Sequence, residues 1–94
     1  MIKRTLNLSN LTLYNNAIST INVIDNILLD MQYNILHNSF NFYVNNVLFK
    51  YDLITNNDLK VIIKAYNTNN NVLLENKLND LKVKCKDYIK SFHN

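Results

Sequence analysis

Residues whose types could support catalysis are few in this 94-residue chain, and their spacing brings none of them together. Cys85 is the single cysteine, and the two histidines are His37 and His93. A nucleophile and its general base must lie within hydrogen-bonding reach of each other. Cys85 instead falls in the apolar stripe of an expected helix, where cysteine behaves as a small buried hydrophobic residue. We therefore expect no enzymatic activity and no catalytic residues.

The carboxylates are equally scattered, and no pair has the helix spacing or strand alternation of a metal or acid–base site. They are Asp25, Asp30, Asp52, Asp58, Glu75, Asp80 and Asp87. The chain has no glycine, which excludes a phosphate-binding P-loop, a dinucleotide-binding fingerprint and a nucleophile elbow. One cysteine cannot form a disulfide framework or a CxxC-based metal site. The sequence therefore predicts neither a cofactor nor a metal.

The stretch from residue 40 to 54 is the element around which we expect the fold to form. A two-residue turn at Asn45-Asn46 would pair two strands, because asparagine tolerates the backbone angles of a tight hairpin. Six large side chains would then share one face: Phe40, Phe42, Val44, Val47, Phe49 and Tyr51.

Residues 59–66 fit two secondary structures. Thr55 and Asp58 resemble a capping box, which would begin a short helix. The β-branched run from Val61 to Ile63 and the alternation of apolar with polar residues favour a strand instead. We predict the strand, which completes a β-meander over residues 40–66.

Two helices are predicted from apolar residues that recur at alternating spacings of three and four. The first runs over about 11–36, and we expect Asn38 to end it in the left-handed conformation. The second runs over about 72–92, after a loop at 67–71. The two stripes are Tyr14, Ala17, Ile21, Ile24, Leu28, Met31 and Ile35, and then Leu74, Leu78, Leu81, Cys85, Tyr88 and Phe92.

Together these elements predict a single α+β domain over residues 1–94. It would have two layers: a three- to four-stranded antiparallel sheet, with an edge strand at 2–8, and both helices on one face. The open face would carry Tyr43, Leu48, Lys50, Lys60, Ile62, Lys64 and Tyr66. Such a face can be merely solvated, can bind a protein, or can bind single-stranded nucleic acid through phosphate-neutralising lysines and stacked rings.

Two helical features add further candidate surfaces. Lys82, Lys86 and Lys90 form a basic stripe that is either a solvated face or a site for phosphates or an acidic partner. In the first helix, Val23 and Ile27, with Ile18 and Leu29, widen the apolar stripe beyond one contact. Either this helix lies deep against the sheet, or it makes a second contact, with a partner or in a homodimer.

Composition points to the origin of the gene. Glycine, proline and tryptophan are absent, there is one arginine, and asparagine is the commonest residue. This codon bias is typical of an AT-rich gene, in a low-GC bacterium or in a phage or mobile element that infects one. We find no secretion signal and no run long enough to span a membrane. We therefore expect a cytoplasmic protein without membrane contact, in the host cytoplasm if a phage encodes it.

A chain with binding surfaces and no catalytic group is expected to act by binding. Our first hypothesis is a small non-enzymatic protein-binding accessory or inhibitor from a phage or mobile element, acting on a host defence complex as anti-CRISPR proteins do. The second is a small nucleic-acid-binding protein that uses the Lys/Tyr sheet face, although a net charge of +3 is mild for that role. The third is a structural subunit that self-associates through the helix at 11–36.

Overall fold

The structure is a computed structural model that describes residues 2–47 and 53–92, with side chains over 11–45 and 53–91. Its elements follow in the order α1 (Ile2–Gln32), α2 (Leu36–Phe42), the π-helical turn η1 (Tyr43–Val47), α3 (Asn56–Asn67) and α4 (Asn71–Phe92). These residues contain no strand. The fold class is therefore all-α, and the predicted α+β domain with its sheet is wrong.

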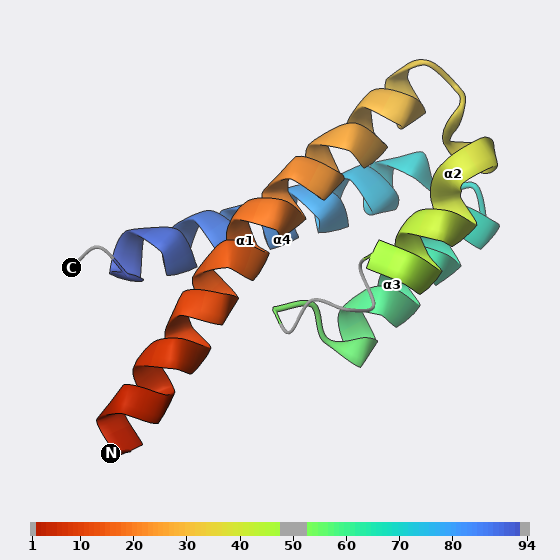
Figure 1. Cartoon of the computed structure of the whole chain (residues 1–94). Helices are drawn as coiled ribbons and strands as arrows, with labels where there is room; N and C mark the ends of the chain where they lie inside the picture. The colour runs from red at the N-terminus through yellow and green to blue at the C-terminus, as the bar shows by residue number, and fades with distance from the viewer. Residues whose placement is uncertain (1, 48–52, 93–94) are drawn as a thin grey trace.

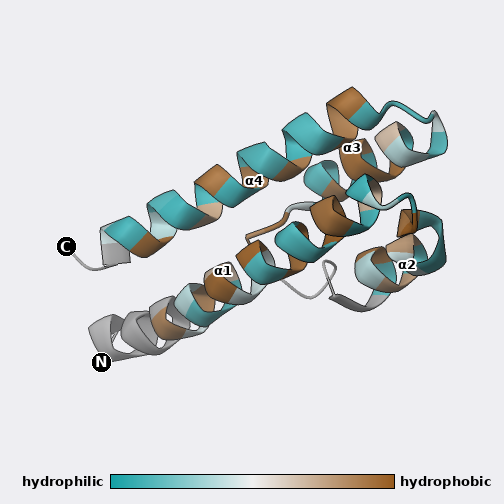
Figure 2. Ribbon diagram, turned by 90° about the horizontal axis from the view of Figure 1, so that it is seen from above, coloured by the Kyte–Doolittle hydropathy of each residue, from teal (hydrophilic) through white to brown (hydrophobic). Residues whose placement is uncertain are grey.

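Two long antiparallel helices, α1 and α4, form the body of the molecule and share its largest helix–helix interface (Figure 1). The first turns of α1 and the last turns of α4 lie at the same end of the pair. The short helices α2 and α3 lie at the opposite end, where α3 packs on α4 (Figure 2). The molecule is accordingly elongated, with extents of 47 × 22 × 19 Å.

The hydrophobic core lies between α1 and α4 and continues to α3. Ile24 and Ile27 of α1, Leu74 and Leu78 of α4, and Ile62 of α3 are each at most 1% exposed. Full burial of a side chain of this size contributes about 1.5–3 kcal/mol. The apolar stripes predicted for the two long helices thus form the main packing surfaces of the fold, with one exception: Ile35 lies beyond the end of α1 and is 45% exposed. The side chain of Phe92 lies outside the described side chains.

The ends of these helices differ from the prediction. The helix predicted over 72–92 is α4, which begins one residue earlier. The helix predicted over 11–36 is α1, but it already includes residues 2–8, so the edge strand is wrong. No glycine or proline interrupts helical hydrogen bonding in this stretch. Because α1 ends at Gln32, Asn38 is not its left-handed cap but lies inside α2.

Asparagine takes the place of glycine at the two tight turns between helices. Asn34 follows α1 with a φ of 60°, and Asn69 follows α3 with a φ of 56°. In each turn the next residue donates its N–H to a carbonyl in the last turn of the helix, at 2.9 Å. This is the Schellman motif, and asparagine is one of the few residues besides glycine that accept its left-handed position. The loop predicted at 67–71 corresponds to this second turn but is shorter, because Asn67 still belongs to α3 and Asn71 already belongs to α4.

Residues 59–66 form part of helix α3, so the predicted strand is wrong. Thr55 Oγ1 accepts the N–H of Asp58 at 3.1 Å, and the Asp58 carboxylate accepts the N–H of Thr55 at 2.9 Å. This capping box starts the helix. Ile62 and Ala65 then face the core together because residues three apart share one side of a helix. The local cap and this burial outweigh the β-branched run.

The predicted hairpin is wrong for a similar reason. Leu36, Phe40 and Val44 are all buried, and their spacing of four places them on one side of α2 and η1. Phe42, which the hairpin would place beside Phe40, is 59% exposed. The second expected strand falls largely on residues 48–52, which lie outside the described residues. In a run with apolar residues at every second position, every other one of them is also spaced by four, as on one side of a helix. Here the residues spaced by four are buried, so the stretch is helical.

Asp58 ties the start of α3 to α4. Lys77 Nζ lies 2.6 Å from its buried carboxylate, and Lys84 Nζ lies 3.9 Å away while also donating to the Leu53 carbonyl at 2.7 Å. Burial alone would raise the pKa of Asp58, but hydrogen bonds from Lys77 and Thr55 outweigh it and hold the pKa below its usual value. The charged carboxylate is therefore the form that stabilises the fold.

We predict that Asp58→Asn lowers the free energy of unfolding by about 2 kcal/mol at neutral pH, because the ion pair with Lys77 is lost and the hydrogen bond from the Thr55 N–H loses its charged acceptor. The folded-state pKa is depressed, so this stabilisation is present above the unfolded pKa of about 3.9 and is lost as pH falls through the folded-state pKa. Urea titrations should show the two proteins converging in strongly acidic solution. The control is Asp80→Asn, because Asp80 is exposed. If Asp58→Asn lowered the free energy of unfolding equally in neutral and in strongly acidic solution, the ion pair would not be the cause.

Candidate functional site

Those residues of the predicted open sheet face that the structure describes do not share one surface. Ile62 lies in the core, whereas Lys60 and Lys64 are exposed on α3. Leu48 and Lys50 lie outside the described residues. Without a sheet in the described chain, the Lys/Tyr face that motivated nucleic-acid binding has no structural basis.

The two tyrosines predicted to contact a partner make contacts within the molecule. Tyr66 stacks on Phe40 with ring centroids 3.8 Å apart and planes 7° apart, so one face of its ring is covered. Partial burial, and then the negative charge and hydrogen bond of Asp30, raise the pKa of Tyr43. Ser39 Oγ donates to the same carboxylate at 2.8 Å. These contacts connect α2 to α3 and to α1, and they connect η1 to α1.

The basic stripe predicted on α4 is partly neutralised. Lys82 Nζ lies 2.6 Å from Asp25 Oδ1 of α1. Lys86 and Lys90 are exposed, and Asp87 is exposed on the same helix. The solvent side of α4 therefore carries charges of both signs, which is typical of a solvated helix face.

Ile27, predicted for self-association, is 1% exposed and belongs to the core, and Val23 is half-buried against that core. Both residues therefore pack within the molecule. Ile18 and Leu29, which widen the same stripe in sequence, are instead 39% and 48% exposed. The wide stripe therefore has an inner part, which packs within the molecule, and an outer part, which is exposed to solvent.

The outer part defines the candidate site, which we call the outer face of α1. Its apolar row is Leu11, Ile18 and Leu29, and its exposed amides are Asn15, Asn22 and Asn26. Spacings of seven and eleven residues are about two and three helical turns, so the three apolar side chains lie in one line. Leu11 is as exposed as Leu29, at 48%. Leu11 was not among the residues predicted to widen the stripe, although its spacing of seven residues from Ile18 was a sufficient signal.

The outer face of α1 also carries little charge. Between residues 11 and 33 the sequence has only two ionisable carboxylates, Asp25 and Asp30. Asp25 pairs with Lys82, and Asp30 accepts a hydrogen bond from Ser39. The Asp25 carboxylate is half exposed, so this pair contributes at most about 1 kcal/mol to stability. Its main effect is to neutralise the border of the outer face.

The groups considered for catalysis are not assembled. Cys85 is buried, and burial raises the pKa of its thiol, against the smaller opposing effects of Lys84 and Thr20. A buried neutral thiol is a poor nucleophile. His37 lies on α2 at the opposite end of the molecule from the last turns of α4, and His93 lies outside the described residues. Among the described side chains, no three His, Cys, Asp or Glu residues are grouped to hold a metal ion.

Comparisons with protein-family models, curated proteins and solved structures find no match to this chain. Over the described ranges, none of the helices combines the length and the apolar character needed to cross a bilayer. A proposal for function must therefore start from the surface chemistry of the helices.

We predict that Ile27→Ala lowers the free energy of unfolding by about 3 kcal/mol, because the substitution leaves a cavity in the core. The same change on the other side of the helix, Ile18→Ala, should alter stability by less than about 0.5 kcal/mol. Urea denaturation of the two variants measures the difference. Equal losses of stability would show that Ile18 and Ile27 do not lie on opposite sides of α1, one exposed and one in the core.

Proposed function

We propose that this protein is a small protein-binding accessory or inhibitor that docks the outer face of α1 on a larger protein complex. The observation that carries the proposal is the exposed row of Leu11, Ile18 and Leu29 on a face whose neighbouring carboxylates are already engaged. The centre of a protein–protein interface is depleted in charge and rich in apolar side chains, while its rim is polar. The amides of the outer face match such a rim, since each carboxamide both donates and accepts hydrogen bonds.

The geometry suits a helix that lies in a groove of its partner. This mode of recognition uses an apolar row on one side of an amphipathic helix. From Leu11 to Leu29 the row extends for about 27 Å, at about 1.5 Å per residue. The inner side of α1 is held by α4, so the helix does not have to be ordered on binding. Because no free energy is lost in ordering the helix, more of the free energy of its contacts contributes to the binding affinity.

Size and composition support the biological setting within this proposal. An inhibitor has only to cover a surface, and 94 residues suffice for that. The AT-rich composition fits a low-GC bacterium as well as a phage or mobile element that infects one. By analogy with anti-CRISPR proteins, we propose the phage or mobile element as the source, a host defence complex as the target and the host cytoplasm as the location. Nucleic-acid binding is less favoured, because Lys77, Lys82 and Lys84 are engaged with Asp58 and Asp25.

The test combines Ile18→Asp with Leu29→Asp. A partner is first isolated from lysate of a low-GC bacterium under nuclease and high salt, and its affinity is then measured with purified proteins. We predict at least a tenfold loss of affinity for the double variant, because charge is placed at the interface centre. The matched control is Val83→Asp, since Val83 is 56% exposed on the charged face of α4.

Three results would contradict this proposal. The control could weaken binding as much as the double variant does. The wild-type protein could recover mainly nucleic acid that is lost at moderate salt, which is the behaviour of a phosphate-dependent binder. Light scattering could instead show a dimer that becomes a monomer with Ile18→Asp, which would assign the outer face of α1 to a self-associating subunit.

A further inference from the structure

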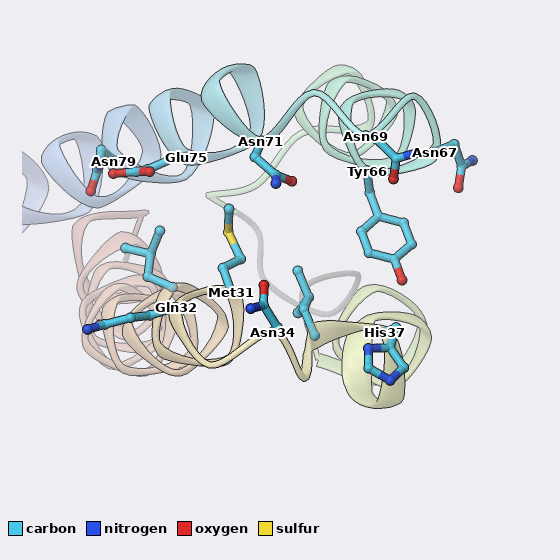
Figure 3. Close-up of a pocket in the computed structure, with 12 residues that line it drawn as sticks. Met31, Gln32, Asn34, His37, Tyr66, Asn67, Asn69, Asn71, Glu75 and Asn79 are labelled. Carbon is cyan, nitrogen blue, oxygen red and sulfur yellow. The ribbon is translucent and has the colours of Figure 1, made fainter.

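A groove lies at the end of the molecule where α1 and α3 terminate, and it is separate from the outer face of α1. Its volume is about 840 Å³, within the range of about 300–1,000 Å³ that is typical of ligand sites. The lining comes from the end of α1, the start of α2, the end of α3 and the start of α4 (Figure 3). None of the three apolar residues of the outer face contributes to it.

One wall of the groove is a regular row of polar side chains on α4. Asn71, Glu75 and Asn79 are exposed and follow each other at intervals of four residues. Figure 3 shows them on the side of α4 that faces Met31 of α1. Residues four apart on a helix rise by about 6 Å, so the row presents three hydrogen-bonding groups over about 12 Å.

This spacing matches the backbone of an extended peptide. An extended chain advances about 3.3 Å per residue and presents the N–H and C=O groups of alternate residues along one edge, about 6.6 Å apart. A carboxamide can pair with both groups, and a carboxylate can accept the N–H. We propose that the groove binds an extended peptide segment of about five residues, whose first, third and fifth residues pair with Asn79, Glu75 and Asn71 in either direction.

The floor and the charge of the groove define the peptide further. Leu28, Met31 and Leu36 form an apolar floor, with Leu36 buried and the other two half-buried. This floor accommodates one apolar side chain of the peptide. Among the described residues that line the groove, Glu75 carries the one carboxylate, none carries an ammonium group, and the imidazole of His37 is the one basic side chain. The groove therefore favours a neutral or basic peptide over an acidic one.

Hydrogen bonds fix the backbone of three turn and helix-start residues that line the groove. Asn34 and Asn69, the left-handed residues of the two Schellman turns, both line it. The side chain of Asn70 caps α4 by accepting the N–H of Leu73 at 3.1 Å, which fixes the backbone that carries Asn71. A site held in this way loses little conformational freedom on binding.

The test uses three pools of pentapeptides, acetylated and amidated at their ends, with a central leucine flanked by lysine, by serine or by glutamate. Amide NMR spectra report the side-chain NH₂ groups of asparagine one by one. We expect the lysine pool to bind most tightly and to shift the signals of Asn71 and Asn79. The signals of Asn22 and Asn26, on the outer face of α1, should stay in place.

Matched variants separate the row from the rest of the helix. Asn79→Ala should weaken binding of the lysine pool about five- to tenfold, the effect of losing a hydrogen bond to a bound ligand. Asn76→Ala, which changes an exposed asparagine of α4 outside the groove, should weaken it less than twofold. N-methylation of the first, third and fifth peptide residues should abolish binding, because their N–H groups pair with the row. N-methylation of the second and fourth residues should leave binding unchanged.

The proposal is overturned if no pool shifts the groove signals, if both N-methylated series bind equally, or if adenosine, which also pairs with carboxamides, binds the groove more tightly than any pool. It does not depend on the proposed function. The variant that combines Ile18→Asp with Leu29→Asp should bind the lysine pool as the wild-type protein does, so failure of one proposal leaves the other testable.

Discussion

The carboxylate of Asp58 is buried, and it remains charged because Lys77 and the backbone of Thr55 donate hydrogen bonds to it. Burying an unpaired carboxylate would be strongly unfavourable, so the pairing of α3 with α4 and the capping of α3 stabilise each other. With α3 held in this position, Ile62 completes the core at one end of the long helices. The start of α3 and its position against α4 therefore depend on this one buried charge.

An all-helical architecture changes where the protein can bind. A two-layer α+β domain would offer a sheet face, whereas the four described helices offer helix sides and the groove at their ends. The two long helices differ sharply in this respect. The solvent side of α4 is charged and suited to water, while the outer face of α1 combines an apolar row with amides. The two proposed sites use different chemistry for this reason: apolar burial on α1, and backbone hydrogen bonds in the groove.

The sequence predicted the long helices because a stripe with helical period persists over many turns in each. It failed at residues 40–47 and 59–66, where apolar residues fit both a period of two and a helical spacing of three or four. The capping box of Thr55 was visible in the sequence, but the strength of its link to Lys77 depends on α4, which lies far along the chain. Ile18 and Ile27 were likewise indistinguishable until packing on α4 fixed the rotation of α1. The groove was beyond prediction because its walls come from separate helices and turns.

Residues 56–67 form a helix, and the binding surfaces are therefore helix faces rather than a sheet. Backbone assignment by NMR would show this helix residue by residue. We expect Cα chemical shifts displaced to the helical side throughout 56–67, with the amide of Asp58 protected from hydrogen exchange by the Thr55 hydroxyl. Strand-like shifts over 59–66 would show that this stretch is not helical and would return Lys60 and Lys64 to a sheet face.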